Sequence, residues 1–196
     1  MKTKENERYP LVVAVTGASG AVYAYRLLEI LMRQNVETHL VITKTAEHII
    51  KTELLKEKAN FVLKDARVKR HDPDKYAVEI ASGSYITSGM AIVPASMGTI
   101  GRIANGTSDN LVARCADVHL KERRTLVVVP RETPLNRIHL ENLLKLHDAG
   151  AVILPAMPSF YAGADSIESL VDTVVARILD HLGIEHGLDI RYHPEK

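Results

Sequence analysis

Short aliphatic runs alternate with helical patterns along the chain. Runs of four or five mostly apolar residues, rich in Val, Ile and Leu, predict strands. They are Leu11–Val15, Thr38–Ile42, Met90–Pro94, Leu126–Val129 and Ala151–Leu154. Between them, apolar residues at helical spacing predict helices near residues 24–31, 46–55, 100–104, 110–121, 140–147 and 166–182. Residues 58–80 are charged and fit neither pattern.

The predicted strands are continuously apolar, and helices separate them. Continuous apolar strands are typical of a parallel sheet whose two faces are both covered by helices. With 196 residues, the chain has the length of a single domain. We therefore expect one α/β domain built on a parallel sheet.

The composition is that of an ordinary globular protein. A formal net charge of +1 gives no general attraction to nucleic acid or to a membrane surface. The apolar runs fall far short of the ~20 residues that span a bilayer. Cys115, the single cysteine, excludes an internal disulfide and suits a reducing compartment. We expect a cytoplasmic protein with no nucleic-acid or membrane partner.

Small, hydroxylated and charged residues follow each predicted strand. These segments are Thr16–Gly20, Thr43–Lys44, Pro94–Thr99, Pro130–Pro134 and Pro155–Pro158. In open parallel sheets, ligands bind outside the carboxyl ends of the strands, where helix N-termini present N–H groups. The pattern therefore predicts a phosphate-bearing ligand at this edge of the sheet.

The first of these segments differs from the loop of a dinucleotide-dependent dehydrogenase. Gly17–Ala21 lacks the third glycine of the G-x-G-x-x-G pattern, and no acidic residue ends the second strand to hold a ribose. The loop instead suits a mononucleotide phosphate, with the hydroxyls of Ser19 and Ser96 and nearby backbone amides as donors.

An ordered series of short motifs extends over residues 10–184. The motifs are Val15–Ala21, Ser82–Ser84, Pro94–Ser96, Asp109–Leu111, Ala116–Val118, Leu120–Arg124, Pro130–Pro134, His139–Asn142, Phe160–Tyr161 and Val175–Leu179. In this order they resemble the flavin prenyltransferases, formerly described as aromatic acid decarboxylases. Each motif is weak alone, and the series is specific.

The resemblance implies a three-layer α/β/α domain of the flavodoxin-like (Rossmann-like) kind over residues 10–184. Residues 1–9 then form a flexible N-terminal tail, and residues 185–196 form a C-terminal tail. It further implies FMN as the prenyl acceptor, dimethylallyl phosphate as the donor, and a homododecamer. A partner decarboxylase receives the prenylated FMN, and no metal is expected.

The resemblance also assigns site residues. FMN contacts fall on Gly17, Ala18, Ser19, Thr43, Ser96, Met97, Gly98, Thr99 and Arg131. Donor contacts fall on Tyr161, Arg177, Lys121, Arg131 and Arg114. Catalytic roles fall on Glu53 and Glu132 as acid and base, and on Lys121 and Ser19. This chemistry is consistent, because Lys and Arg stabilise the charge of a leaving phosphate and a carboxylate accepts the proton.

Structural roles remain open for several of these residues. Lys121 could complement a helix C-terminus, and Glu53 could be a solvated helix residue. Glu132 could form an ion pair with its neighbour Arg131. Arg177 stands among apolar residues, which favours a functional role. The nine histidines show no His-x-x-x-His spacing, which disfavours a metal site.

Two other functions remain as alternatives. One is a flavoprotein cysteine decarboxylase, a group that relies on a histidine before the third strand and a Pro-x-Met-Asn motif after the fourth. Here Ser82–Ser84 and Arg131–Pro134 stand at those places, which disfavours it. The other is a non-enzymatic flavin-binding subunit of a decarboxylase complex. The second set of phosphate-binding residues argues against a mere carrier.

Overall fold

The computed structural model describes residues 9–160 and 163–188. Within this part of the chain, six strands form one sheet in the order β3-β2-β1-β4-β5-β6, and every neighbouring pair is parallel. The strands are β1 (Leu11–Val15), β2 (Thr38–Ile42), β3 (Lys69–His71), β4 (Gly89–Ala95), β5 (Leu126–Pro130) and β6 (Val152–Ile153). This is the strand order of the doubly wound Rossmann fold.

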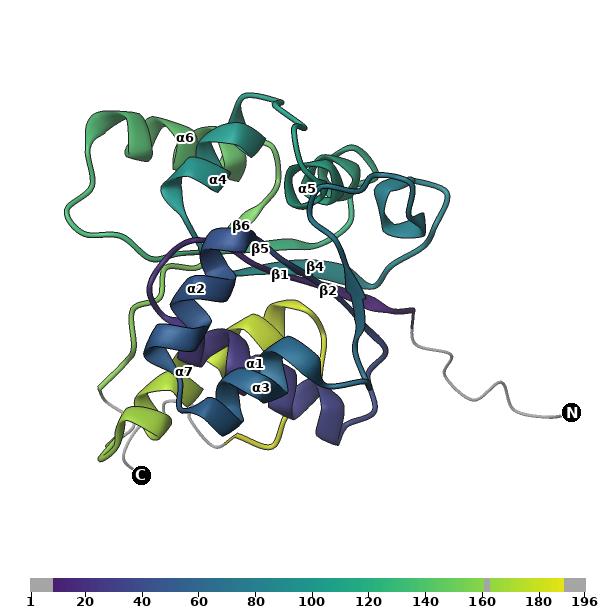
Figure 1. Ribbon diagram of the computed structural model, residues 1–196. Coiled ribbons are helices and arrows are strands. Elements are labelled where there is room, and N and C mark those ends of the chain that lie inside the picture. Colours follow the sequence, from purple (N-terminus) through teal and green to yellow (C-terminus); the bar gives the residue numbers. More distant parts are fainter. Residues whose placement is uncertain (1–8, 161–162, 189–196) are drawn as a thin grey trace, which may run out of the picture.

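Helices cover both faces of the sheet. They are α1 (Ala21–Arg33), α2 (Lys44–Glu53), α3 (Lys56–Lys64), α4 (Met97–Ala104), α5 (Leu111–Lys121), α6 (Arg137–Asp148) and α7 (Ile167–His181). Figure 1 shows α4, α5 and α6 on one face, and α1, α2, α3 and α7 on the other. The predicted three-layer α/β/α domain with a parallel sheet is therefore confirmed.

Alternate residues of the central strands enter two separate cores. Leu11, Val13 and Val15 of β1 pack in the core that α1 and α7 close. Val12 and Ala14 pack in the core that α4 and α5 close. Because both faces of the central sheet are buried, β1 and β5 are apolar at every position and show no alternating pattern.

Residues 58–80 are more regular than the sequence suggested. They contain the end of α3, the strand β3, and a single 3-10 turn, η1 (Glu79–Ala81). β3 consists of Lys69, Arg70 and His71 and lies at the sheet edge beside β2. A short edge strand with exposed charged side chains carries no apolar pattern, so its sequence could not reveal it.

Most of the two expected tails, residues 1–9 and 185–196, lies outside the described residues. Among the helices that are described, none combines the length and the apolar character needed to cross a bilayer.

Candidate functional site

One threonine joins the loops that follow the two central strands. The Thr16 hydroxyl donates to the carbonyl of Pro94 at 2.9 Å and accepts the N–H of Ser96 at 2.8 Å. Thr16 is fully buried, and β1 and β4 are neighbours whose following helices lie on opposite faces of the sheet. Ligands of doubly wound sheets bind at such a switch point. The sequence predicted Thr16 only as part of the segment Thr16–Gly20 and did not reveal that it links two loops, although a hydroxyl directly after a buried strand was the available signal.

The glycines of the β1 loop permit two tight conformations. A Cβ on Gly17 would lie 2.8 Å from the Thr45 methyl group, so glycine allows the loop to approach α2 closely. Gly20 has φ of 111°, in the region that favours glycine, and it is the N-cap of α1. Ser19, between them, is half-buried and faces the neighbouring Glu53.

Glu53 ends α2 and caps the N-terminus of α1. Its Oε2 accepts the backbone N–H groups of Gly20 and Ala21, each at 2.8 Å. Burial alone would raise the pKa of this carboxyl, but hydrogen bonds from Ser19, Ala21 and Gly20, and the charge of Arg131, together lower it. Glu53 is therefore ionised near neutral pH and suited to accept a proton rather than to donate one.

Arg131, directly after β5, lies beside the β1 loop. Its backbone N–H donates to Ala95 at 3.3 Å, and its side chain lies beside Gly20 and Tyr23. Burial raises the pKa of the Tyr23 phenol, and the Arg131 charge opposes that change. The adjacent Glu132 is exposed and accepts the N–H of its neighbour Thr133 at 3.0 Å.

Two further loops place helix N-termini at this edge. Thr43 caps α2 by accepting the N–H of Ala46 at 3.3 Å, and Ser96 caps α4 by accepting the N–H of Thr99 at 3.3 Å. Met97 and Thr99 are buried, whereas Gly98 is exposed. A helix start with exposed N–H groups suits a phosphate. All of the expected FMN contacts, with Glu53 and Glu132, thus lie on loops or helix ends at one edge of the sheet.

Lys121 lies near the amino ends of the strands, on the side of the sheet opposite the loops that carry Arg131. Lys121 ends α5, before β5 begins, and forms an ion pair with Glu122. Since β5 rises by ~3.3 Å per residue, its length places Lys121 roughly 15 Å or more from Arg131. Arg114, also on α5, donates to the carbonyl of Ala81 at 3.1 Å. Within one chain, Lys121 therefore does not lie at the edge that carries Arg131.

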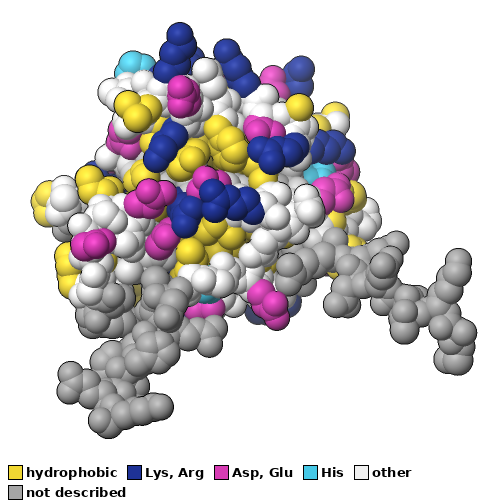
Figure 2. Space-filling view, turned by 90° about the horizontal axis from the view of Figure 1, so that it is seen from below, with side chains coloured by type: hydrophobic (Ala, Val, Ile, Leu, Met, Phe, Trp, Pro, Cys, Tyr) yellow, Lys and Arg dark blue, Asp and Glu magenta, His cyan; other side chains and the backbone are white. Residues whose placement is uncertain are grey.

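Arg177 lies on the exposed side of α7. It forms an ion pair with Asp180 at 3.0 Å, and its side chain is 58% exposed, so it does not lie on the apolar side of α7 as its neighbours suggested. α7 packs along α1, where Arg26 pairs with Asp172 at 2.6 Å. Figure 2 shows this helical layer from outside, with basic and acidic side chains interspersed among apolar ones. Tyr161 lies outside the described residues.

Known proteins resemble this chain over nearly its whole length. It is 48% identical over 192 residues to the flavin prenyltransferase UbiX of Halalkalibacterium halodurans. The alignment covers 94% of this chain and 93% of that protein. The crystal structure of AnUbiX (PadA1) in complex with FMN and dimethylallyl pyrophosphate matches with a TM-score of 0.89 and 44% identity, over 97% of this chain and 100% of that one.

A second solved structure is a dodecameric FMN-dependent Ubix-like decarboxylase from Escherichia coli O157:H7. It matches with a TM-score of 0.87 and 42% identity, over 94% of this chain and 100% of that one. Residues 1–179 match the Flavoprotein family. The chain therefore belongs to the Flavoprotein family and, within it, to the flavin prenyltransferases.

Proposed function

We propose that this protein transfers a dimethylallyl group from dimethylallyl phosphate to reduced FMN and supplies the prenylated FMN to a partner decarboxylase. The observation that carries the proposal is the similarity to AnUbiX, which was crystallised with FMN and dimethylallyl pyrophosphate. Residues 10–184 form the flavin-binding domain. The buried, unpaired thiol of Cys115 is consistent with a cytoplasmic location.

We place FMN between the loops after β1 and β4, a region that we call the proposed flavin crevice. Since the ionised Glu53 already occupies the N-terminus of α1, a phosphate placed there would meet a like charge. The start of α4 is the better position for the FMN phosphate, because Ser96 and the exposed Gly98 lie there and Arg102 is next to Gly98. The flavin ring would supply an electron-rich acceptor.

Three charged side chains of this protein have separate roles in the reaction. Arg131 stabilises the negative charge that develops on the leaving phosphate. Glu132, exposed beside it, is placed to exchange a proton with the substrates. Glu53 keeps its negative charge and orients the Ser19 hydroxyl toward the crevice. A closed, dry pocket protects the allylic cation from water.

The donor site is completed by neighbouring copies of the chain in a homododecamer. Lys121 lies too far from Arg131 to act with it inside one protomer, and Arg114 and Arg177 pair with Asp117 and Asp180 of their own helices, so neighbouring protomers are the source of these residues in this proposal. The dodecameric relative from E. coli supports this assembly. In the same way, the exposed apolar side chains of α6 are candidate subunit contacts: Ile138, Leu140 and Leu144 are 65%, 54% and 59% exposed.

The test is incubation of the protein with reduced FMN and dimethylallyl phosphate without oxygen, followed by mass measurement of the flavin. We expect a flavin heavier by one isoprene unit, and no product when the donor is omitted. FMN that binds but stays unmodified would favour the flavin-binding subunit instead. Release of carbon dioxide from a cysteine-ended peptide, with unmodified flavin, would favour the cysteine decarboxylase.

A further inference from the structure

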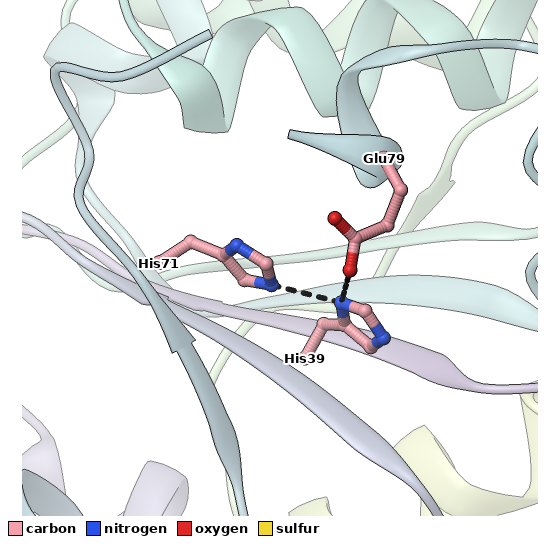
Figure 3. A group of neighbouring side chains, drawn as sticks. All are labelled: His39, His71 and Glu79. Atoms are coloured by element: carbon pink, nitrogen blue, oxygen red, sulfur yellow. Dashed lines mark hydrogen bonds and ion pairs between the residues drawn. The ribbon is translucent and has the colours of Figure 1, made fainter. Parts of the chain in front are cut away.

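Two histidines and a glutamate meet at the sheet edge formed by β2 and β3. His39 lies on β2, His71 ends β3, and Glu79 begins η1 (Figure 3). The Nδ1 of His39 is 2.8 Å from the Nε2 of His71 and 3.8 Å from a carboxylate oxygen of Glu79. One ligand atom from each of the three residues lies within 4.8 Å of the other two.

These separations are close to those of a metal centre. With Zn–N bonds of about 2.0–2.1 Å, two nitrogens of a tetrahedral Zn²⁺ site lie roughly 3.3 Å apart. The two distances from His39 Nδ1, 2.8 and 3.8 Å, lie on either side of that value. Shifts of about half an ångström would bring both of these distances to that value. Two imidazoles and one carboxylate form a ligand set that leaves a fourth position for water.

We propose that His39, His71 and Glu79 bind a divalent transition-metal ion, for which Zn²⁺ is the best-suited ion. The ion would join β2 to β3 and η1, which lie much later in the sequence. Its role is structural, since it would fix the charged segment between α3 and β4 onto the sheet. This site is separate from the proposed flavin crevice. His39 lies on β2, four residues before Thr43, and its side chain faces the layer of α4 and α5.

The outer partners of His39 support metal binding. Its Nε2 is 3.2 Å from the Tyr85 hydroxyl and 3.7 Å from a carboxylate oxygen of Glu37. Either oxygen can accept a hydrogen bond from Nε2–H, which leaves the lone pair of Nδ1 free to face His71 and Glu79. Metal-binding histidines are commonly oriented in this way through their second nitrogen.

The protonation states are those that a metal requires. Burial lowers the pKa of His39, and the Lys69 charge lowers it further. Burial and the neighbouring His39 likewise lower the pKa of His71. The hydrogen bond from Lys69 lowers the pKa of Glu79 to about 2. At neutral pH the imidazoles are therefore neutral and the carboxylate is ionised.

The Lys69 ammonium competes with a metal ion for the Glu79 carboxylate. It contacts the same Glu79 oxygen that faces His39. The Lys69 side chain is 57% exposed, so it can swing into solvent when an ion arrives. Glu79 itself is partly exposed, with 31% of its side chain accessible, so solvent reaches the cluster at this residue.

The experiment is a calorimetric titration of Zn²⁺ into full-length, chelator-treated protein that carries no added histidine tag. We expect about one Zn²⁺ per chain, with the affinity weakened about tenfold or more by His71→Ala and by Glu79→Gln. Glu79→Gln keeps the side-chain shape, so it decides the question if His71→Ala fails to fold. The control His48→Ala removes an exposed histidine of α2 and should leave the affinity unchanged.

Lys69→Met distinguishes a metal site from a cluster held together only by hydrogen bonds. Removing the competing ammonium should tighten Zn²⁺ binding several-fold, whereas loss of a mere surface ion pair would not. The proposal is overturned if Zn²⁺ does not bind saturably, or if His71→Ala and Glu79→Gln leave its affinity unchanged. Unchanged affinity in Lys69→Met would overturn the assignment of Glu79 as a ligand. The cluster would then be a hydrogen-bonded histidine pair only.

Discussion

The carboxylate of Glu53 lies 2.8 Å from the backbone nitrogen of Ala21, at the first turn of α1. Since Glu53 ends α2, this contact fastens one helix to the start of another, directly beneath the proposed flavin crevice. A negative charge at a helix N-terminus is stabilising, because it faces the unsatisfied N–H groups there. The same residue therefore supports the fold and sets the charge of the site.

Glu53→Gln should lower stability in a pH-dependent way. The pKa of Glu53 is below its ordinary value of 4.5, so its stabilisation is complete above that value and is lost as pH falls through the lowered pKa. At neutral pH we expect a loss of about 0.5 kcal/mol, a small figure because solvent screens this partly exposed group. Urea unfolding across the acid range checks this. The exposed Glu185→Gln is the control, and an equal loss at every pH would contradict the prediction.

Gly17→Ala should destabilise the fold, because the new Cβ would meet the Thr45 methyl group at 2.8 Å. Overpacking of this kind costs about 1–3 kcal/mol. Thr45→Ala in the same chain should recover most of the loss. Gly98→Ala is the matched control, since its nearest neighbour would be the Arg102 guanidinium at an ordinary 3.5 Å. Thermal unfolding of the four proteins measures these effects; no recovery in the double variant would show that Thr45 is not the obstacle.

Ser19→Leu should weaken FMN binding, since leucine would fill the crevice beside the β1 loop. Quenching of flavin fluorescence gives the affinity directly. Ser108→Leu, at an exposed serine outside the crevice, should bind FMN as the unmodified protein does. Equal affinity in Ser19→Leu would mean that the flavin lies elsewhere.

Arg177→Ala and Glu132→Gln should have different kinetic effects. The arginine variant should raise KM for the prenyl donor and leave FMN affinity nearly intact. The glutamine variant should lower kcat by the ~100–10,000-fold that lost acid–base help typically costs. Arg33→Ala, which removes an exposed arginine of α1, is the control. If both variants lost only FMN affinity, the proposed division of roles would be wrong.

A mixed assembly can test whether the donor site is shared between protomers. Lys121→Ala and Glu132→Gln should each be nearly inactive alone. Co-expressed in equal amounts, they should recover about a quarter of full activity, since that fraction of sites would draw both residues from unaltered copies. Activity no higher than that of the separate variants would place Lys121 and Glu132 in one protomer.

The sequence predicted the fold well because apolar runs report burial. Leu11–Val15 and Thr38–Ile42 match β1 and β2 fully, since both faces of each strand are covered. β3 was missed because an edge strand needs no apolar side chains. Val152–Ile153 is shorter than predicted, since an aliphatic run at the other edge pairs on one side only.

Prediction of the site was limited by distance in the sequence. The loop residues around Gly17 and Ser96 could be placed together, because parallel strands bring their carboxyl ends to one edge. The separation of Lys121 from Arg131 was not evident. The local sequence does not show whether a residue acts in the site of its own protomer or in that of a neighbouring protomer. The pairing of His39 with His71 was also missed, because they are 32 residues apart and only strand register brings them together.

The hydroxyls of Thr43 and Ser96 cap α2 and α4 while facing the proposed flavin crevice. Replacing such a cap costs about 1 kcal/mol of stability, whether or not a ligand is present. Selection for folding alone is therefore enough to retain both residues. A descendant that had lost flavin binding would keep them, whereas the exposed Arg131 would be free to drift. Conservation of Arg131 among related sequences, more than conservation of Thr43 and Ser96, should therefore indicate that a relative still binds the flavin.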